Sequence, residues 1–343
     1  MVVFGPVSIR LMARFGLRHT LVLSVLMFGI GLICTSFTSE YLGGLFCVAA
    51  VVVGRSTSLL FTATNSLPTQ WFGSRLGLAN GLVKTGGGIG ATVLPIVAQK
   101  LIDKAGLQWT FRILGLIVLS VGIPCALLLP ERTGVRPPRF EWDMLKLVPF
   151  ATITLAGAIV VFGLYVLPFF LPLFANSIGL SASTGAGLVA GFGAATTAGR
   201  LSSGWACDRV GAINTLALAA FINGLSMLAI WPVSSSQGPL YVFAVVNGLA
   251  NGSIFVSLPT AIATLCPVSP AASVTLMTFF WTPGYLLCPP IAGILVDLTG
   301  AQSASSIGPY RAAIFYAAAT SILSTVLIVV LRIRIASKLI SKL

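Results

Sequence analysis

The chain is a succession of long apolar runs separated by short breaks that contain charged residues, proline or glycine. A membrane-spanning helix needs about 20 predominantly apolar residues. Runs such as residues 20–37 show no alternation of apolar and polar positions, which the strands of a membrane β-barrel would require. Runs of spanning length begin near Thr20, Leu42, Leu76, Thr110, Val148, Ala182, Ile213, Leu240, Ala272 and Tyr310. The pattern therefore predicts an all-α polytopic membrane protein.

Two stretches depart from this pattern and suggest how the chain is divided. The first apolar run extends only from residue 1 to Arg10, which is about half of what a bilayer core of about 30 Å requires. The segment Pro130–Lys146 is the longest charged stretch of the sequence. We therefore predict an incomplete N-terminal transmembrane half over residues 1–130, a cytoplasmic linker over 131–147 and a C-terminal transmembrane half over 148–343.

The composition and the placement of charge support a multi-pass membrane protein. Hydrophobic residues make up 57% of the chain and charged residues 8%, whereas soluble domains carry about a quarter charged residues. The formal net charge of +13 would allow an acidic partner, but the basic residues gather in loops on one side of the predicted spans. These are Arg10, Arg14, Arg18, Arg75, Arg132, Arg136, Arg139, Lys146, Arg209, Arg332, Arg334, Lys338 and Lys342. Short cytoplasmic loops are rich in Lys and Arg, so we place the linker and the C-terminus in the cytoplasm and expect no nucleic-acid partner. We expect the plasma membrane, with an organelle membrane as the alternative.

Few residues are suited to catalysis or metal binding. His19 is the one histidine, and the six cysteines are scattered through apolar segments without CxxC spacing. Isolated cysteines of this kind usually pack as small hydrophobes. Since the sequence also has no carboxylate pair within a span, we expect neither an enzyme nor a cofactor or metal site.

Arg200 is the most informative candidate, because it lies inside an apolar stretch that spans residues 188–205. A central arginine in a membrane helix costs about 3 kcal/mol on translocon-insertion scales, so such residues usually face a water-filled path or an anionic partner. A guanidinium group also matches the geometry of a carboxylate in a bidentate pair. The alternative is a structural arginine bonded to helix ends near the cytoplasmic surface.

Further candidates for substrate binding each have an alternative structural interpretation. Arg55 stands near the middle of the fourth-helix span and would line the cavity from the N-terminal half, unless it pairs with helix carbonyls. Lys84 could instead extend to the membrane surface. Asn247 and Asn251, four residues apart, are equally compatible with contacts between helices. Tyr165 is equally compatible with a core aromatic residue.

A short turn recurs in both halves of the chain. ARFG at residues 13–16 and DRVG at residues 208–211 each follow an apolar run and precede the next one. Gly16 and Gly211 are 195 residues apart (211 − 16), which is the spacing expected for repeated six-helix halves.

These turns resemble the major facilitator superfamily, in which a G-x-x-x-D-R-x-G turn joins the second and third helices of each half. The C-terminal copy matches in full through Gly204, Asp208, Arg209 and Gly211, whereas the N-terminal copy keeps Arg14 and Gly16 but has Ile9 and Ala13 at the glycine and aspartate positions. The resemblance implies a major facilitator fold of two six-helix halves, with the first helix and part of the second missing. The resemblance also implies a conformational-switch motif made of Arg14, Gly16, Gly204, Asp208, Arg209 and Gly211. The N-terminal copy lacks the aspartate that would make the charge contact of this motif.

A narrower resemblance points to the monocarboxylate porters. Residues 70–95 are similar to the fifth-helix signature of that family, through Trp71, Phe72, Arg75, the segment 78–81 and glycines 86, 87, 88 and 90. Pro289–Gly300 resembles the end of its eleventh helix. The glycines of the first segment also predict a face with few side chains, against which another helix can approach closely.

This resemblance aligns Arg200 with the arginine that pairs with the substrate carboxylate in that family. Proton-coupled members carry an aspartate four residues earlier, where this chain has Thr196. The resemblance therefore argues less for proton symport and more for facilitated or anion-driven transport of the substrate. We therefore predict a secondary transporter of a small organic anion, monocarboxylate-like, that works by alternating access in the lipid bilayer. The coupling ion and an accessory membrane subunit are left open. The alternatives are a transporter of a larger metabolite or vitamin such as riboflavin and, in another class, a non-transporting truncated remnant or membrane scaffold.

Overall fold

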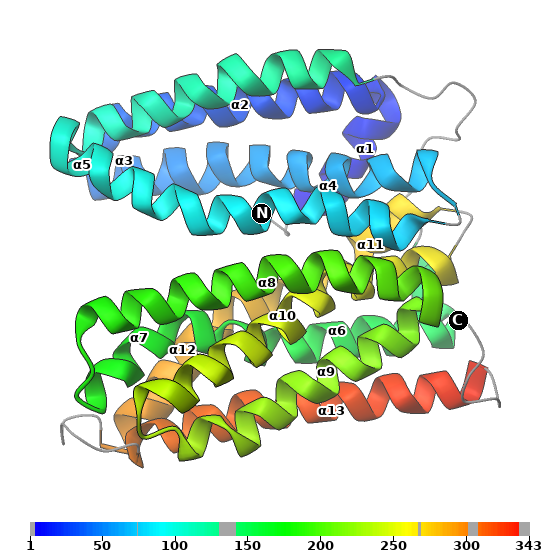
Figure 1. Ribbon diagram of the computed structural model, residues 1–343. Helices are drawn as coiled ribbons and strands as arrows, with labels where there is room; N and C mark the ends of the chain where they lie inside the picture. The colour runs from blue at the N-terminus through cyan, green and yellow to red at the C-terminus, as the bar shows by residue number, and fades with distance from the viewer. Residues whose placement is uncertain (1–3, 74, 130–141, 267–268, 301–307, 336–343) are drawn as a thin grey trace. The chain divides into compact units, whose positions relative to one another are not determined.

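A computed structural model of the chain describes residues 4–73, 75–129, 142–266, 269–300 and 308–335. Every regular element in these ranges is helical (Figure 1), as the apolar pattern predicts. Eight helical segments are long and apolar enough to cross a membrane by length and composition: Leu17–Thr38, Leu42–Trp71, Ile96–Leu128, Val148–Ser177, Ala212–Val233, Gln237–Leu265, Pro270–Leu298 and Gly308–Ile335. The chain is therefore an integral multi-pass membrane protein.

Helices begin close to the starts of the predicted runs. Before the central linker they are α1 (Gly5–Phe15), α2 (Leu17–Thr38), α3 (Leu42–Leu45), the π-helix η2 (Phe46–Val53), α4 (Gly54–Trp71) and α5 (Leu76–Leu128). After it come η3 (Trp142–Lys146), α6 (Val148–Leu164), α7 (Val166–Ser177), α8 (Ala182–Val210), α9 (Ala212–Ala229), η4 (Trp231–Val233), α10 (Gln237–Leu265), α11 (Pro270–Phe279), α12 (Thr282–Leu298), η5 (Gly308–Tyr310) and α13 (Arg311–Ile335). Most of the predicted linker lies outside the described residues.

The long element α5 contains two of the predicted spans joined at Gly106. This residue has φ 82° and ψ 168°, a backbone conformation that glycine adopts without steric cost. The Thr110 hydroxyl donates a hydrogen bond of 2.8 Å to the Gly106 carbonyl and so begins the second helix.

The two repeated turns share one conformation. Gly16 and Gly211 have φ 82° and 100°, and each separates two helices. Four residues later, the Thr20 and Thr215 hydroxyls donate to the carbonyls of Gly16 and Gly211 at 2.7 and 2.8 Å. The internal repeat inferred from the sequence therefore extends to backbone geometry and to a threonine that follows each glycine.

Contacts divide the chain into two compact units that differ at two places from the predicted halves. The first unit comprises the described residues within 1–73, 93–141 and 268–279, and the second those within 74–92, 142–267 and 280–343. The beginning of α5 thus belongs with the C-terminal helices, where its glycines pack against α8. Conversely, α11 belongs with the N-terminal helices, where it contacts α1 and α4.

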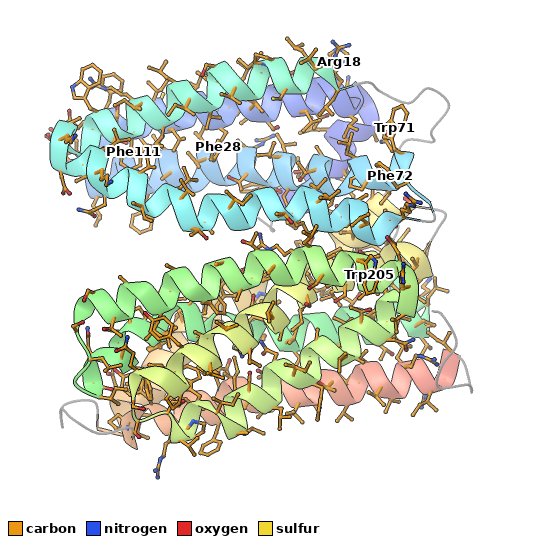
Figure 2. All side chains as sticks on the ribbon, in the orientation of Figure 1. Arg18, Phe28, Trp71, Phe72, Phe111 and Trp205 are labelled. Carbon is orange, nitrogen blue, oxygen red and sulfur yellow. The ribbon has the colours of Figure 1, made fainter. Side chains whose placement is uncertain are left out.

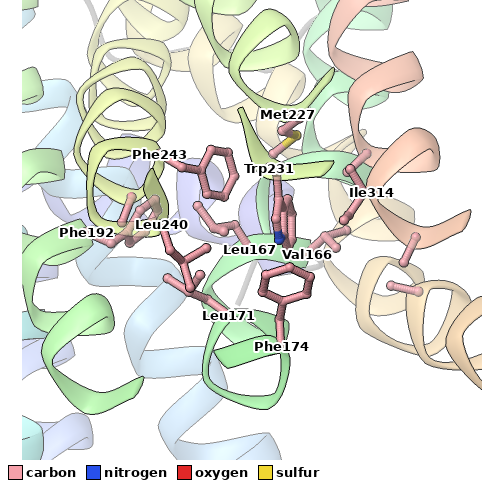
Figure 3. Packing of buried hydrophobic residues seen from close by; sticks show 14 of the residues in the cluster. Val166, Leu167, Leu171, Phe174, Phe192, Met227, Trp231, Leu240, Phe243 and Ile314 are labelled. Carbon is pink, nitrogen blue, oxygen red and sulfur yellow. The ribbon is translucent and has the colours of Figure 1, made fainter. Parts of the chain in front are cut away.

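Each unit has its own apolar core. In the second unit α7 contributes Leu167, Leu171 and Phe174, which pack with Trp231 and Phe243 (Figure 3). The Phe174 ring meets the Trp231 ring edge-on at 5.8 Å between centroids. The smaller core of the first unit consists of Met12, Leu17, Leu21, Ala63, Ala126 and Ala271. The core of the second unit joins α7, α8, α10 and α12, which include the helices that carry the candidate site.

Candidate functional site

The beginning of α5 lies directly against the end of α8 in the second unit. A Cβ atom added at Gly204 would lie 2.7 Å from the Gly77 carbonyl oxygen and 3.2 Å from the Gly81 Cα atom. A Cβ added at Gly81 would lie 2.7 Å from the Arg200 carbonyl oxygen. The predicted glycine face of α5 is therefore a close helix contact, and its partner is α8.

This contact predicts the effect of adding a single methyl group. We expect Gly204→Ala to lower the stability of the protein, on the order of 1–3 kcal/mol, because the methyl group would force two backbones apart. Gly86→Ala in α5 is the matched control, since a Cβ there would have nothing within 4 Å. Thermal unfolding in detergent measures both variants. Equal melting temperatures for Gly204→Ala and Gly86→Ala would contradict the close contact.

Asp208 of the repeated motif caps the first turn of α5. Its two carboxylate oxygens accept hydrogen bonds from the backbone N–H groups of Gly77 and Leu78, both at 2.8 Å. The first N–H groups of a helix have no partner within the helix, and they form the positive end of its dipole. Asp208 therefore joins α8 to α5 through a charge-assisted contact.

The neighbouring motif residues have different surroundings. The Arg209 guanidinium lies 4.6 Å from the centre of the Trp205 ring, and both residues are exposed. Trp205 lies near the end of α8 (Figure 2). In the N-terminal copy of the turn Arg14 is exposed and lies 5.7 Å from the Phe15 ring. Since Ala13 has no carboxylate, that copy offers no counterpart of the Asp208 cap.

Arg200 is held one turn before Gly204 at the same helix contact. Its Nη1 atom donates a hydrogen bond of 2.7 Å to the Lys84 carbonyl oxygen of α5. Gly87 and Gly88 leave room for the guanidinium, because a Cβ at either position would lie 3.3 Å from Nη1. The buried Nε atom of Arg200 has no hydrogen-bond partner. Arg200 is thus fixed at one nitrogen and retains donor capacity elsewhere.

A second cation lies close to Arg200. The Lys84 side chain is half-buried on α5 and is near enough to Arg200 for the two positive charges to interact. Like charges at short range in a poorly solvated region raise each other's energy. That the two residues bind a substrate together stays a prediction.

Aromatic rings extend from Arg200 across three further elements. The guanidinium carbon lies 5.7 Å from the centre of the Phe255 ring on α10. Tyr165 meets Phe255 edge-on at 6.2 Å between centroids, and Tyr285 of α12 lies 5.1 Å from Tyr165. Trp281 follows at 6.4 Å from Tyr285. We call Phe255, Tyr165 and Tyr285 the aromatic ladder.

Tyr165 is positioned by a helix break that Asn251 compensates. Pro168 has no N–H with which to bond the Leu164 carbonyl four residues earlier, and α6 ends at Leu164. The Asn251 amide nitrogen donates to that carbonyl at 3.2 Å. Asn251 therefore stabilises the break beside the ladder, while direct substrate contact by this residue stays a prediction.

Asn247 is placed in the packing between helices. It is fully buried, and its amide nitrogen donates to the Ser226 hydroxyl at 2.9 Å and to the Asn223 carbonyl at 3.3 Å. The Ser321 hydroxyl in turn donates to the Asn223 side-chain oxygen at 2.9 Å. These bonds link α9, α10 and α13, as the structural alternative for Asn247 anticipates.

The structure also defines the surroundings of Arg55 and Thr196. Arg55 is exposed in the first turn of α4, directly after the π-helix η2, and belongs to the first unit. Its role as a second arginine of the substrate site stays a prediction. Thr196, four residues before Arg200, donates its hydroxyl to the Phe192 carbonyl at 2.8 Å.

Two residues of the site, Phe255 and Asn80, are not among the candidates that the sequence pattern indicates. Phe255 lies four residues after Asn251 and therefore on the same face of α10, a spacing that could have identified it. The Asn80 amide donates to the Thr260 hydroxyl at 3.0 Å and adds a polar contact between α5 and α10. The partner of Asn80 has no signal in the sequence.

Comparisons with known proteins agree with this architecture. The sequence profile of the Major Facilitator Superfamily matches residues 1–233 and, in a second match, residues 153–340. MFS-type transporter 1 of Ophiocordyceps sp. (strain BCC 1869) is 28% identical over 334 residues, covering 96% of this chain and 73% of the relative. The Fujikurins efflux protein of Gibberella fujikuroi (strain CBS 195.34) is 27% identical over 264 residues, covering 75% of this chain and 56% of the relative.

Solved structures show the same fold at low sequence identity. The fucose:proton symporter FucP of E. coli superposes with a TM-score of 0.76 at 16% identity, covering 96% of this chain and 87% of the symporter. The proton:xylose symporter XylE gives a TM-score of 0.72 at 11% identity, covering 95% of this chain and 82% of that protein. At this identity the likeness establishes the fold of the chain.

Proposed function

Because the chain belongs to the major facilitator superfamily, we propose that it is a secondary transporter of an organic anion whose charged group binds Arg200. The observation that carries this proposal is the buried, unpartnered Nε of Arg200 in a guanidinium already fixed through Nη1. An unsatisfied buried donor is costly. An anion that accepts from this nitrogen would remove that cost.

The charge balance of the site supports an anion over a neutral solute. Arg200 brings a positive charge to the contact between α5 and α8, and Lys84 brings a second basic side chain. An anion bound beside them is attracted by the guanidinium and favours the protonated form of Lys84. A neutral solute of the same shape would gain neither effect.

The substrate class is proposed more broadly than monocarboxylates. The resemblance of residues 70–95 to monocarboxylate porters favours a small acid, whereas the curated relatives have the broader names MFS-type transporter and efflux protein. One of these relatives is named as an efflux protein, which supports export as the direction of transport. We place the protein in the plasma membrane, with the linker and the C-terminus in the cytoplasm.

Counterflow into proteoliposomes tests the proposal. Vesicles that contain the purified protein and unlabelled benzoate would be diluted into labelled benzoate. We expect labelled benzoate to accumulate transiently, and pyruvate to compete with it. The neutral amides, benzamide and pyruvamide, should compete at least about tenfold more weakly, which corresponds to one lost charged hydrogen bond.

Protein-free vesicles and the Lys146→Gln variant serve as controls. Lys146 pairs with Asp143 at 2.6 Å and is exposed, so its replacement removes a positive charge outside the membrane spans. That variant should transport like the parent. Equal competition by amides and carboxylates would contradict an anionic substrate.

A further inference from the structure

We infer that the aromatic ladder selects a planar aromatic anion, whose rings lie on Phe255, Tyr165 and Tyr285 while its charged group pairs with Arg200. This inference rests on the proposed function, because it assumes that Arg200 binds the anionic group of the substrate. It adds a substrate class and three residues that would determine specificity.

The first support is the continuity between the charge and the rings. Arg200 lies 5.7 Å from Phe255, Phe255 lies 6.2 Å from Tyr165, and Tyr165 lies 5.1 Å from Tyr285. These separations are within the range of direct aromatic contacts. An anion paired with Arg200 therefore meets an aromatic surface at once.

The second support is the partial exposure of the three rings of the ladder. Phe255, Tyr165 and Tyr285 are each partly exposed within the second unit. Leu167 and Leu171, which follow Tyr165 on α7, are fully buried in the apolar core. The ladder thus borders that core without being closed by it. Because a charge is not kept facing lipid, the nearness of Arg200 favours a substrate path over lipid as the neighbour of Phe255.

The third support is that the far end of the ladder is held rigidly. Trp281 is 2% exposed and lies 6.4 Å from Tyr285. Its indole nitrogen lies against α6, where a Cβ added at Gly157 would be 2.8 Å away. In the middle of the ladder, the Asn251 amide supports the break that presents Tyr165. Rings held in place lose little conformational freedom when a ligand binds.

The arrangement favours an aromatic acid over an aliphatic one of the same size. Aromatic rings prefer edge-on or offset contacts with other rings, and these contribute beyond the area that they bury. A saturated ring system buries similar area but lacks this contribution. A short aliphatic acid would pair with Arg200 and leave Tyr165 and Tyr285 uncovered.

Equilibrium binding to the purified full-length protein tests the inference with three probes. These are naphthoate, its saturated counterpart decahydronaphthoate, and the neutral methyl ester of naphthoate. We expect naphthoate to bind about tenfold more tightly than decahydronaphthoate. We expect Phe255→Leu to abolish most of this preference and Phe255→Trp, which keeps a ring, to retain it.

The control variant is Phe169→Leu. Phe169 lies on α7 in the same unit and is 57% exposed, so its replacement changes an aromatic residue outside the ladder and should leave the preference unchanged. If Phe255→Leu does not fold, the comparison of the two acids on the unmodified protein still decides the question.

The outcomes separate the two proposals. If naphthoate and decahydronaphthoate bind equally and both lose affinity in Arg200→Gln, the aromatic inference is overturned and the anion proposal stands. If the methyl ester binds as tightly as naphthoate, the anion proposal is overturned and the inference built on it fails as well.

Discussion

Asp208→Asn is expected to reduce transport by about tenfold or more while the protein still reaches the membrane. The Asp208 carboxylate accepts two hydrogen bonds from the first turn of α5, and hydrogen bonds to a charged group contribute about 1.5–3 kcal/mol each. Asparagine has one acceptor oxygen and no charge. A loss of about 2 kcal/mol would change the population of the joined α5–α8 state about thirtyfold.

The expected mechanism is an altered conformational balance. An alternating-access transporter must both form and release contacts of this kind in each cycle. If the Asp208 cap stabilises one conformational state of the transporter, a weaker cap lowers the population of that state and slows the transport cycle. Substrate affinity at Arg200, one helix turn beyond Gly204, should change less than the rate.

Cys207 provides a direct readout of that conformational change. Its thiol is buried next to Asp208, and its Cβ would lie 2.7 Å from a Cβ added at Gly77. Replacing the exposed cysteines Cys34, Cys47 and Cys125 by serine removes the background labelling that they would cause. In that background, Asp208→Asn should make Cys207 react faster with a maleimide.

Asp143→Asn is the matched control for Asp208→Asn. Asp143 is exposed and pairs with Lys146 in the short helix η3, so its replacement removes the same charge without touching α5. Transport and Cys207 labelling should equal those of the parent. An Asp208→Asn protein that transports and labels like this control would contradict the role of the cap.

Much of the fold follows from residue patterns that act locally. Apolar runs of about 20 residues place the helices because a helix satisfies its own backbone groups inside a bilayer. Gly16 and Gly211 mark the repeated turns because a positive φ favours glycine. Gly106 likewise has a positive φ, and it lies between the two predicted spans of α5.

Other features depend on partners that leave no mark in the sequence. Asp208 binds the N–H groups of Gly77 and Leu78, and Arg200 binds the carbonyl of Lys84. Every residue offers a backbone carbonyl and every residue except proline a backbone N–H, so the sequence identifies Asp208 and Arg200 but not what they contact. The break at Tyr165 is explained by Pro168 in the following turn, whereas its support by Asn251 comes from another helix.

The candidate site was predicted in part. Arg200 and Lys84 are brought together at the α5–α8 contact, which the glycines of α5 allow. The four-residue spacing from Asn251 puts Phe255 on the same face of α10, but nothing in its residue type indicates a neighbouring arginine. Only packing places its ring against the Arg200 guanidinium and the Tyr165 ring.

Arg200→Gln is the second change with a large expected effect, and it should reduce benzoate counterflow by about a hundredfold. Glutamine keeps a polar side chain, but it is shorter and removes the charge and the forked geometry that match a carboxylate. Arg200→Lys keeps the charge without the fork, so we expect intermediate activity. Lys146→Gln again controls for the loss of a positive charge outside the spans.

Equilibrium binding of labelled benzoate to purified parent and Arg200→Gln protein tests the central claim most directly. It separates recognition of the anion from the later steps of transport, and melting temperatures show whether both proteins are folded. We predict saturable binding by the parent and an affinity at least about tenfold lower for folded Arg200→Gln. Equal affinities in the two folded proteins would contradict the claim that Arg200 binds the substrate anion.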